Sequence, residues 1–117
     1  MGTGFHDLEV WRDAKALAVT TYRLTTHLKD FSLRDQIRRA AVSVPSNIAE
    51  GDERDTDKDS VRFFFIAKGS LAELRTQIEI AVEVGLITSS EATPVLASAA
   101  ALGRRLGALI KSRAHVA

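Results

Sequence analysis

The sequence contains no cysteine in its 117 residues. A disulfide framework and a thiolate metal site are therefore excluded, and the lack of thiols favours a reducing cytoplasm. The first segment, MGTGFHDLEVW, has neither a basic region nor an apolar run, so we expect no secretory signal there. The sequence also has no run of about eighteen apolar residues, and we expect no membrane partner. We predict a cytoplasmic protein.

Motifs of common catalytic sites are missing as well. There is no P-loop, no HExxH and no glycine-rich turn between a strand and a helix. None of the three histidines, His6, His27 and His115, follows a glutamate three positions earlier. This excludes the paired Glu-x-x-His motif of a ferritin-type di-iron site. We therefore expect no enzyme, no cofactor and no bound metal.

The composition is typical of a globular protein, with 45% hydrophobic and 26% charged residues and a net charge of +1. Apolar residues recur at gaps of three and four, and we find no strand pattern, long linker or internal repeat. The sequence predicts an all-α fold, an antiparallel up-and-down four-helix bundle that forms one domain over residues 1–117. The predicted helices span approximately residues 7–30, 33–51, 57–84 and 90–112.

Short local signals mark the ends of these helices. Ser32 is the expected N-cap of the second helix, because its hydroxyl can accept from a free backbone N–H. Gly51 is expected to end that helix in a left-handed conformation. Thr56 and Asp59 have the spacing of a capping box at the start of the third helix, and Gly85 is expected to end it.

Two prolines fall within predicted helices. Pro45 is expected to kink the second helix and not to end it, because the apolar spacing of Ala41, Val44 and Ile48 continues through it. Pro94 is expected in the first turn of the fourth helix, where proline is tolerated.

A polar stripe runs beside the apolar face of the second helix. Antiparallel packing about the turn near Arg54 would set Arg39 opposite Glu73. A partly buried ion pair there would define the register more than it would add stability. We favour this structural interpretation over the alternative, a ligand-binding role. The predicted polar seam consists of Gln36, Arg39, Ser43, Asn47 and Glu50 on the second helix and Glu73 and Gln77 on the third.

The third helix is apolar on nearly all sides in its first half, VRFFFIAKGSLA. Phe63, Phe65 and Ile66 point in directions that the core-facing stripe does not cover. Exposed apolar area of this size usually marks a protein contact. These three residues are therefore the predicted oligomer interface.

Basic residues provide candidate contacts to phosphates. A symmetric oligomer would repeat a modest basic patch and make salt-sensitive binding feasible at a low net charge. The alternative is a solvated basic face and tail. The candidate nucleic-acid-binding residues are Arg34, Arg38, Arg104, Arg105, Lys111 and Arg113.

Three segments, DLEVW, LRDQIRRAAVSVPSNIAEG and RFFFIAKGSLAELRTQIEIAVEVGLI, together resemble the four-helix-bundle family of 23S rRNA intervening-sequence proteins over about Phe5 to Ile87. The resemblance implies an antiparallel bundle, a ring-like homopentamer, no enzymatic activity, and reading frames often located inside intervening sequences of ribosomal RNA genes. A related branch comprises accessory proteins of diversity-generating retroelements. These are similar pentamers that bind nucleic acid and a reverse transcriptase through a basic surface.

One feature departs from the family pattern. The turn after NIAEG is often basic in the family, whereas here acidic residues outnumber Arg54 and Lys58. Because acidic groups repel phosphates, we expect no nucleic-acid binding at that turn. The fourth helix carries little of the family signature, so Arg104 and Arg105 receive no role from the resemblance. The acidic residues of the turn are Asp52, Glu53, Asp55, Asp57 and Asp59.

The expected function is that of a non-enzymatic homo-oligomeric scaffold, pentameric by resemblance, whose partners are further copies of itself and structured RNA. The alternative is a protein-interaction adaptor without affinity for nucleic acid. A hydrolase that uses Glu50 ranks third. RNA binding with a steep dependence on salt would favour the first hypothesis over the second.

Overall fold

The computed structural model describes residues 4–114, which form a short 3₁₀ turn, Gly4–Asp7, followed by four long helices. No β-strand occurs in these residues, in agreement with the predicted all-α class. None of these helices combines the length and hydrophobicity that a bilayer crossing requires. The helices are α1 (Glu9–Leu24), α2 (Phe31–Asp52), α3 (Asp57–Glu83) and α4 (Ser89–Ala114).

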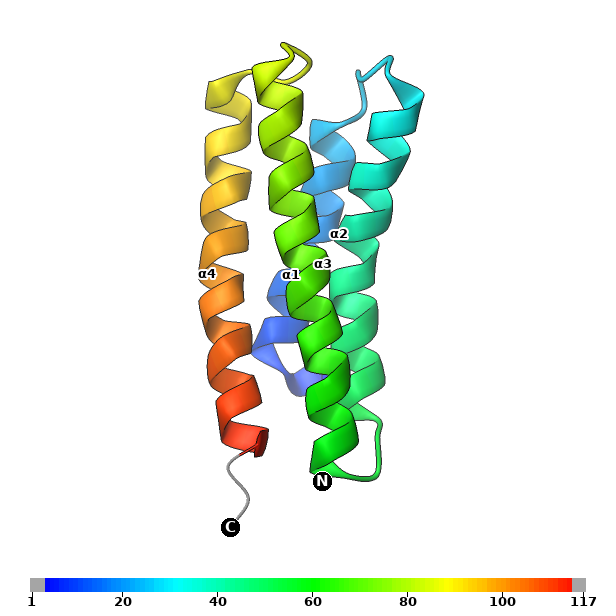
Figure 1. The fold of residues 1–117 in the computed structure, drawn as a ribbon, viewed down its shortest axis with the longest axis vertical. Coiled ribbons are helices and arrows are strands. Elements are labelled where there is room, and N and C mark those ends of the chain that lie inside the picture. The colour runs from blue at the N-terminus through cyan, green and yellow to red at the C-terminus, as the bar shows by residue number, and fades with distance from the viewer. Residues whose placement is uncertain (1–3, 115–117) are drawn as a thin grey trace.

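The helices run up and down along the long axis of a body that measures 49 × 22 × 21 Å (Figure 1). Each helix packs against the next one in the sequence, and α4 closes the bundle by packing against α1. Helices α1 and α3 therefore occupy opposite corners, with α3 in front of α1 in Figure 1. This arrangement confirms the predicted antiparallel topology.

Every helix buries one apolar stripe in a shared core. Ile48 of α2, Phe64 and Leu74 of α3, and Leu106 of α4 are completely buried. Within each of these helices, the buried residues recur at gaps of mostly three and four, which places them on one side of the helix. The apolar pattern thus identified the inward side of α2, α3 and α4 correctly.

The first helix ends at Leu24, and the prediction that it continues to about residue 30 is wrong. The Thr25 hydroxyl donates to the carbonyl oxygen of Thr21 at 2.8 Å. Such side-chain hydrogen bonds compete with the helical backbone pattern and favour helix ends. Leu28 is nevertheless 5% exposed, because the loop returns it to the core. Leu28 therefore fits the apolar spacing of the first helix although it lies in the loop that follows.

The N-cap of α2 is Asp30 and not the predicted Ser32. The Oδ1 atom of Asp30 accepts a hydrogen bond from the backbone N–H of Leu33 at 3.0 Å. A carboxylate is also favoured there by the positive end of the helix dipole. The helix accordingly begins at Phe31, slightly earlier than predicted.

The prediction that Gly51 ends α2 in a left-handed conformation is wrong. The helix continues to Asp52, and only Gly4 and Gly85 among the described residues have positive φ. A β-carbon on Gly51 would lie 2.7 Å from Cε1 of Phe64 and 3.0 Å from the carbonyl oxygen of Ser60. Close approach of α3 therefore explains this glycine. Gly85, with φ +83°, follows α3 as predicted.

The third helix starts with the predicted cap. The Thr56 hydroxyl oxygen accepts from the backbone N–H of Asp59 at 3.2 Å. In α2, helical structure continues through Pro45, as predicted.

Pro94 lies in the second turn of α4, and its predicted place in the first turn is wrong. A capping box that the sequence analysis missed starts this helix earlier. The backbone N–H of Glu91 donates to the Thr88 hydroxyl at 3.1 Å, and the N–H of Thr88 donates to the Glu91 carboxylate at 3.0 Å. The hydrogen bonds from the backbone N–H and hydroxyl of Thr88 lower the pKa of Glu91 below its ordinary value.

Candidate functional site

The polar seam lies between α2 and α3, with small side chains at its centre. The Ser43 and Ser70 hydroxyl oxygens are 2.8 Å apart, and Asn47 Nδ2 donates to the Ser43 hydroxyl at 2.9 Å. The predicted register, with Arg39 opposite Glu73, would set Ser43 opposite Gly69, so this register was correct to within one residue. These contacts give the centre of the seam a structural role.

The predicted ion pair between Arg39 and Glu73 does not form within the chain. Both residues are exposed, and no ion pair of residues 4–114 includes either of them. Serine-sized side chains bring α2 and α3 close together at the centre of the seam, and the two long side chains extend to solvent outside it. Arg39 and Glu73 thus remain two unpaired charges at the same height.

The other polar residues of the seam have separate surroundings. Glu50 is exposed and pairs with Arg54 at 2.9 Å, one turn further along the helix. Gln36 is exposed, and Oε1 of Gln77 is buried without a hydrogen-bond partner. Gln36 and Gln77, both predicted members of the seam, therefore form no hydrogen bond with each other.

The histidines have no catalytic arrangement in the part of the chain described. His6 stacks on Phe5 with ring centroids 4.2 Å apart and meets the edge of Trp11 at 5.0 Å. His27 is exposed in the turn after α1, and His115 lies outside the described residues. No three His, Cys, Asp or Glu side chains within residues 4–114 are positioned to hold a metal ion.

Two candidate phosphate-binding arginines have partners within the chain, and one of them joins α1 to α2. Arg38 donates from Nε to the Thr25 hydroxyl at 2.9 Å and from Nη2 to the carbonyl oxygen of Tyr22 at 3.0 Å. It therefore satisfies a carbonyl at the C-terminal end of α1. Arg34 pairs with Asp35 at 3.0 Å and lies over the ring of Phe31. Both guanidinium groups therefore have partners within the chain.

Two further candidates connect helices. Arg105 of α4 forms ion pairs with Glu9, at 2.9 Å, and with Asp13 of α1. Arg113 pairs with Asp52 at 2.9 Å in a partly buried position, and its guanidinium faces the ring of Phe64. Both arginines link segments that are distant in the sequence, so the structure gives them structural partners.

The remaining candidates, Arg104 and Lys111, are exposed, and no ion pair within residues 4–114 involves them. They lie on one side of α4, and Gly107 lies between them. The ammonium group of Lys68 is 3.8 Å from the position that a β-carbon of Gly107 would take. The side chain of Lys68 therefore extends from α3 to α4, where its ammonium group lies beside Gly107, between Arg104 and Lys111.

Arg75 extends this group along α3, because it lies two turns beyond Lys68 on the same side of the helix. It is exposed as well. The sequence analysis missed Lys68 and Arg75, although their spacing of seven residues places them on one side of a helix. Nothing in the sequence indicated that this side lies next to α4. We call these four residues the basic patch: Lys68, Arg75, Arg104 and Lys111.

The predicted interface residues differ in exposure. Phe65 is 56% exposed and Ile66 is 44% exposed, and Ile80 on the same side of α3 is 46% exposed. Phe63 is instead half-buried, with the guanidinium groups of Arg54 and Arg62 over its ring. Phe63 is thus covered within the chain. We define the α3 ridge by Phe65, Ile66, Gly69, Glu73 and Ile80.

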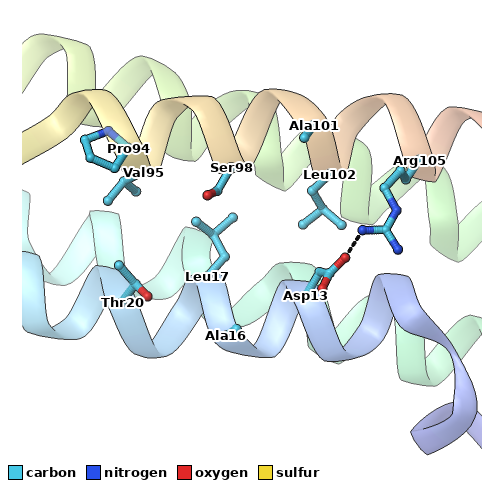
Figure 2. A pocket seen from close by; sticks show the side chains of 10 residues that line it. All are labelled: Asp13, Ala16, Leu17, Thr20, Pro94, Val95, Ser98, Ala101, Leu102 and Arg105. Atoms are coloured by element: carbon cyan, nitrogen blue, oxygen red, sulfur yellow. Dashed lines mark hydrogen bonds and ion pairs between the residues drawn. The ribbon is translucent and has the colours of Figure 1, made fainter.

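A cleft between α1 and α4 was not anticipated from the sequence. It has a volume of about 340 Å³, and Figure 2 shows small and apolar side chains on both walls with the Asp13–Arg105 ion pair at one end. No nucleophile with an adjacent base lines it, so its shape suits packing better than catalysis. The lining residues are Asp13, Ala16, Leu17, Thr20, Pro94, Val95, Ser98, Ala101, Leu102 and Arg105.

Comparisons with known proteins agree with this architecture. Residues 6–108 match the sequence profile of a family described as 23S rRNA-intervening sequence protein. The chain matches no curated protein. Its fold is similar to the crystal structure of a protein with unknown function from the S23 ribosomal protein family of Bacteroides thetaiotaomicron. The TM-score is 0.83 at 22% sequence identity, and the similarity covers 87% of this chain and 98% of that one.

The two comparisons carry different weight. At 22% identity, the solved structure shows a shared fold and nothing about function. The family profile covers most of the chain, including the segments DLEVW, VPSNIAEG and GSLAEL on which the sequence resemblance rested. The chain therefore belongs to the family of 23S rRNA-intervening sequence proteins.

Proposed function

We propose that this protein is a non-enzymatic helical scaffold that assembles into a homo-oligomer and binds structured RNA through its outer surface. The observation that carries the proposal is the α3 ridge, whose large apolar side chains face away from a core that α3 otherwise fills. The family resemblance favours five copies.

The α3 ridge supports self-assembly for an energetic reason. Leaving Phe65, Ile66 and Ile80 about half exposed forgoes stabilisation of roughly 25 cal/mol for each Å² of apolar surface that could be buried. Gly69 adds a flat position in the middle of the ridge, since no atom would lie within 4 Å of its β-carbon. A helix surface of this kind can approach another surface closely.

The basic patch supports RNA binding. Its four cations are exposed and lack acidic partners among the described residues, whereas Arg38, Arg105 and Arg113 have structural partners. A closed oligomer would repeat the patch in every copy, and the affinity for phosphates rises with the number of contacts. The family description names a 23S rRNA intervening sequence, so ribosomal RNA fragments are the first ligands to test.

Solution mass tests the assembly. Phe65→Asp and Ile66→Asp should each lower the mass seen by light scattering and leave the helical circular dichroism signal unchanged, since neither side chain is in the core. Ala97→Asp is the control with the same introduced charge, because Ala97 is exposed on α4 and is not part of the ridge. A monomeric wild-type protein would refute self-assembly.

RNA titration at two salt concentrations tests the second part. Lys68→Glu and Arg104→Glu should weaken binding of ribosomal RNA fragments, and each lost phosphate contact should reduce the slope of log K against log salt by about 1. Lys58→Glu in the acidic first turn of α3 is the control with the same charge change. Binding that does not depend on salt or on these substitutions would contradict the proposal.

A protein-interaction adaptor is the second candidate, and the α1–α4 cleft is the observation that favours it. The cleft presents small and apolar walls of the kind that accept a partner side chain. This candidate gains support if the oligomer forms normally but shows no affinity for RNA at low salt.

A further inference from the structure

A second exposed apolar surface lies between α1 and α2. Val19, Tyr22 and Val42 are each between 42% and 44% exposed there, and they line a groove of about 360 Å³. Pro45 and Ala18 also line the groove. Of the other three long helices, α2 packs only against α1 and α3, and neither α3 nor α4 lines the groove. We call this surface the α1–α2 groove.

The rim of the α1–α2 groove is basic. Lys15 and Arg23 line the groove, and Arg39 lies beside Tyr22 and Val42 in the adjoining depression. The side chains of Arg23 and Arg39 have no hydrogen bond or ion pair with any described residue. The nearby carboxylate of Asp35 is already paired with Arg34. The groove therefore combines apolar walls with three cations, of which Lys15 lies over the ring of Trp11 and the side chains of Arg23 and Arg39 have no ion-pair partner among the described residues.

The α3 ridge has the opposite charge at its centre. Ile66, Gly69, Glu73 and Ile80 follow one another at gaps of three, four and seven residues, so they form one stripe on the side of α3 away from the core. Glu73 is exposed and forms no ion pair with any described residue. An apolar stripe with a central carboxylate thus faces outward on one side of the molecule, while an apolar groove with cationic rims faces outward on another.

The two surfaces match in height as well as in chemistry. The Ser43–Ser70 hydrogen bond sets the level of α2 against α3. Arg39 precedes Ser43 by about one helical turn and Glu73 follows Ser70 by about one turn, so both lie at the same height in these antiparallel helices. On the same basis, Gly69 lies about half a helical turn from the level of Val42. In a closed ring whose axis runs parallel to the bundles there is no shift along that axis, so residues keep their heights from one copy to the next.

We propose that the α3 ridge of one copy docks into the α1–α2 groove of the next, with Glu73 pairing with Arg39 and Arg23 of the neighbour. This inference rests on the proposed self-assembly and specifies its contact. Because α1 and α3 lie at opposite corners of the bundle, groove and ridge are different surfaces of one chain, and the contact is head-to-tail. Such contacts produce rings when the rotation closes. The contact also supplies ion-pair partners for Arg39 and Glu73, which have none among the described residues.

Charge reversal separates this contact from an ion pair within one chain. Glu73→Arg places like charges opposite Arg39 and Arg23, and Arg39→Glu places like charges opposite Glu73. Each variant alone should self-associate about tenfold more weakly or worse. A one-to-one mixture should recover part of the mass, because the reversed ridge of one variant meets the reversed groove of the other and the unaltered surfaces meet as in the wild type. In a ring of five alternating copies, four contacts are matched in this way and one is not. An ion pair within the chain could not be restored by mixing.

Two control variants test whether a charge reversal elsewhere on the surface has the same effect. Asp55→Arg and Lys58→Glu make the same charge changes in the α2–α3 turn region and should leave the mass unchanged. Circular dichroism verifies that every variant is folded. Recovery of mass in the mixture supports the head-to-tail contact. An oligomeric wild type whose mass is unaffected by either reversal, or whose variants do not complement each other, overturns it and leaves self-assembly standing. A monomeric wild type refutes the proposed function itself.

Discussion

The α2–α3 contact and the α1–α4 contact hold the same bundle together in opposite ways. Between α2 and α3, the Ser60 hydroxyl donates to the carbonyl oxygen of Gly51 at 2.6 Å, and the ring of Phe64 lies where a β-carbon of Gly51 would be. Between α1 and α4, Arg105 reaches across to Glu9 and Asp13 beside a cleft of about 340 Å³.

Residue size explains this difference. Glycine and serine at the α2–α3 contact let two backbones approach closely, so dispersion contacts and buried apolar area are concentrated there. Long charged side chains bridge α1 and α4 at the surface, where water weakens their attraction. We therefore expect most of the stability to reside in the α2–α3 contact, while the α1–α4 contact can change at little cost.

The largest expected effect is that of Phe64→Ala. Phe64 is completely buried between α2 and α3, so its removal should lower the free energy of unfolding by about 3–5 kcal/mol. Val95→Ala at the α1–α4 cleft should lower the free energy of unfolding by only about 1–2 kcal/mol. The substitution removes two methyl groups from a side chain that already lines an open cleft. Urea denaturation measures both. Equal costs would remove the distinction between the two contacts.

Gly51→Ala should destabilise the protein by about 1–3 kcal/mol through overpacking, despite alanine's higher helix propensity. Neither the buried ring of Phe64 nor the Ser60 carbonyl can move freely away from the new methyl group. Gly69→Ala is the control within α3, where no atom lies within 4 Å, and it should stabilise the isolated chain by up to about 1 kcal/mol. Thermal unfolding at low protein concentration measures both variants. If Gly51→Ala also stabilises the protein, α2 and α3 leave room for a methyl group at Gly51, and the proposed overpacking is wrong.

The ion pair between Asp13 and Arg105 should contribute little. Both side chains are more than 40% exposed, so a double-mutant cycle with Asp13→Ala and Arg105→Ala should give a coupling energy below about 1 kcal/mol. The coupling should shrink as salt is added, because ions screen exposed charges. Denaturation at low and high salt measures it. A large coupling that does not depend on salt would show that α1–α4 is as firmly joined as α2–α3.

The smallest expected effect concerns the start of α4. The pKa of Glu91 is lowered because the backbone N–H and hydroxyl of Thr88 hydrogen-bond its charged form. Stabilisation from this carboxylate is therefore present above its ordinary pKa of 4.5 and disappears as the pH falls through the lowered pKa of the folded state. Glu91→Ala should lower the melting temperature slightly at neutral pH. The difference from the wild type should narrow well below pH 4.5, and a difference that widens in acid would contradict this sign.

The sequence predicted helix bounds best where local chemistry and core packing agree. Helix α3 was predicted over residues 57–84 and spans Asp57–Glu83, because the Thr56 cap and the positive φ of Gly85 define its ends locally. The end of α1 was missed because Leu28 satisfies the apolar spacing from a loop. Burial alone cannot distinguish a helical residue from a loop residue that packs on the same core.

The candidate surfaces were less predictable than the helices. A list of arginines could not show that Arg38 would hold the end of α1, or that Arg113 would pair with Asp52. It also could not show that Lys68 would join Arg104 and Lys111 across two helices. Partners of charged side chains depend on which helices become neighbours, and the spacing within one helix does not contain that information.

The sequence by itself determined the four helices, their core-facing sides and their family, because these depend on apolar periodicity and on motifs within single segments. Tertiary structure alone decided which charges are paired, which apolar side chains stay exposed, and why Gly51 is required. The physical reason is distance. Periodicity acts over a few residues along one helix, whereas ion pairs, clefts and close backbone contacts join atoms that the sequence separates by tens of residues.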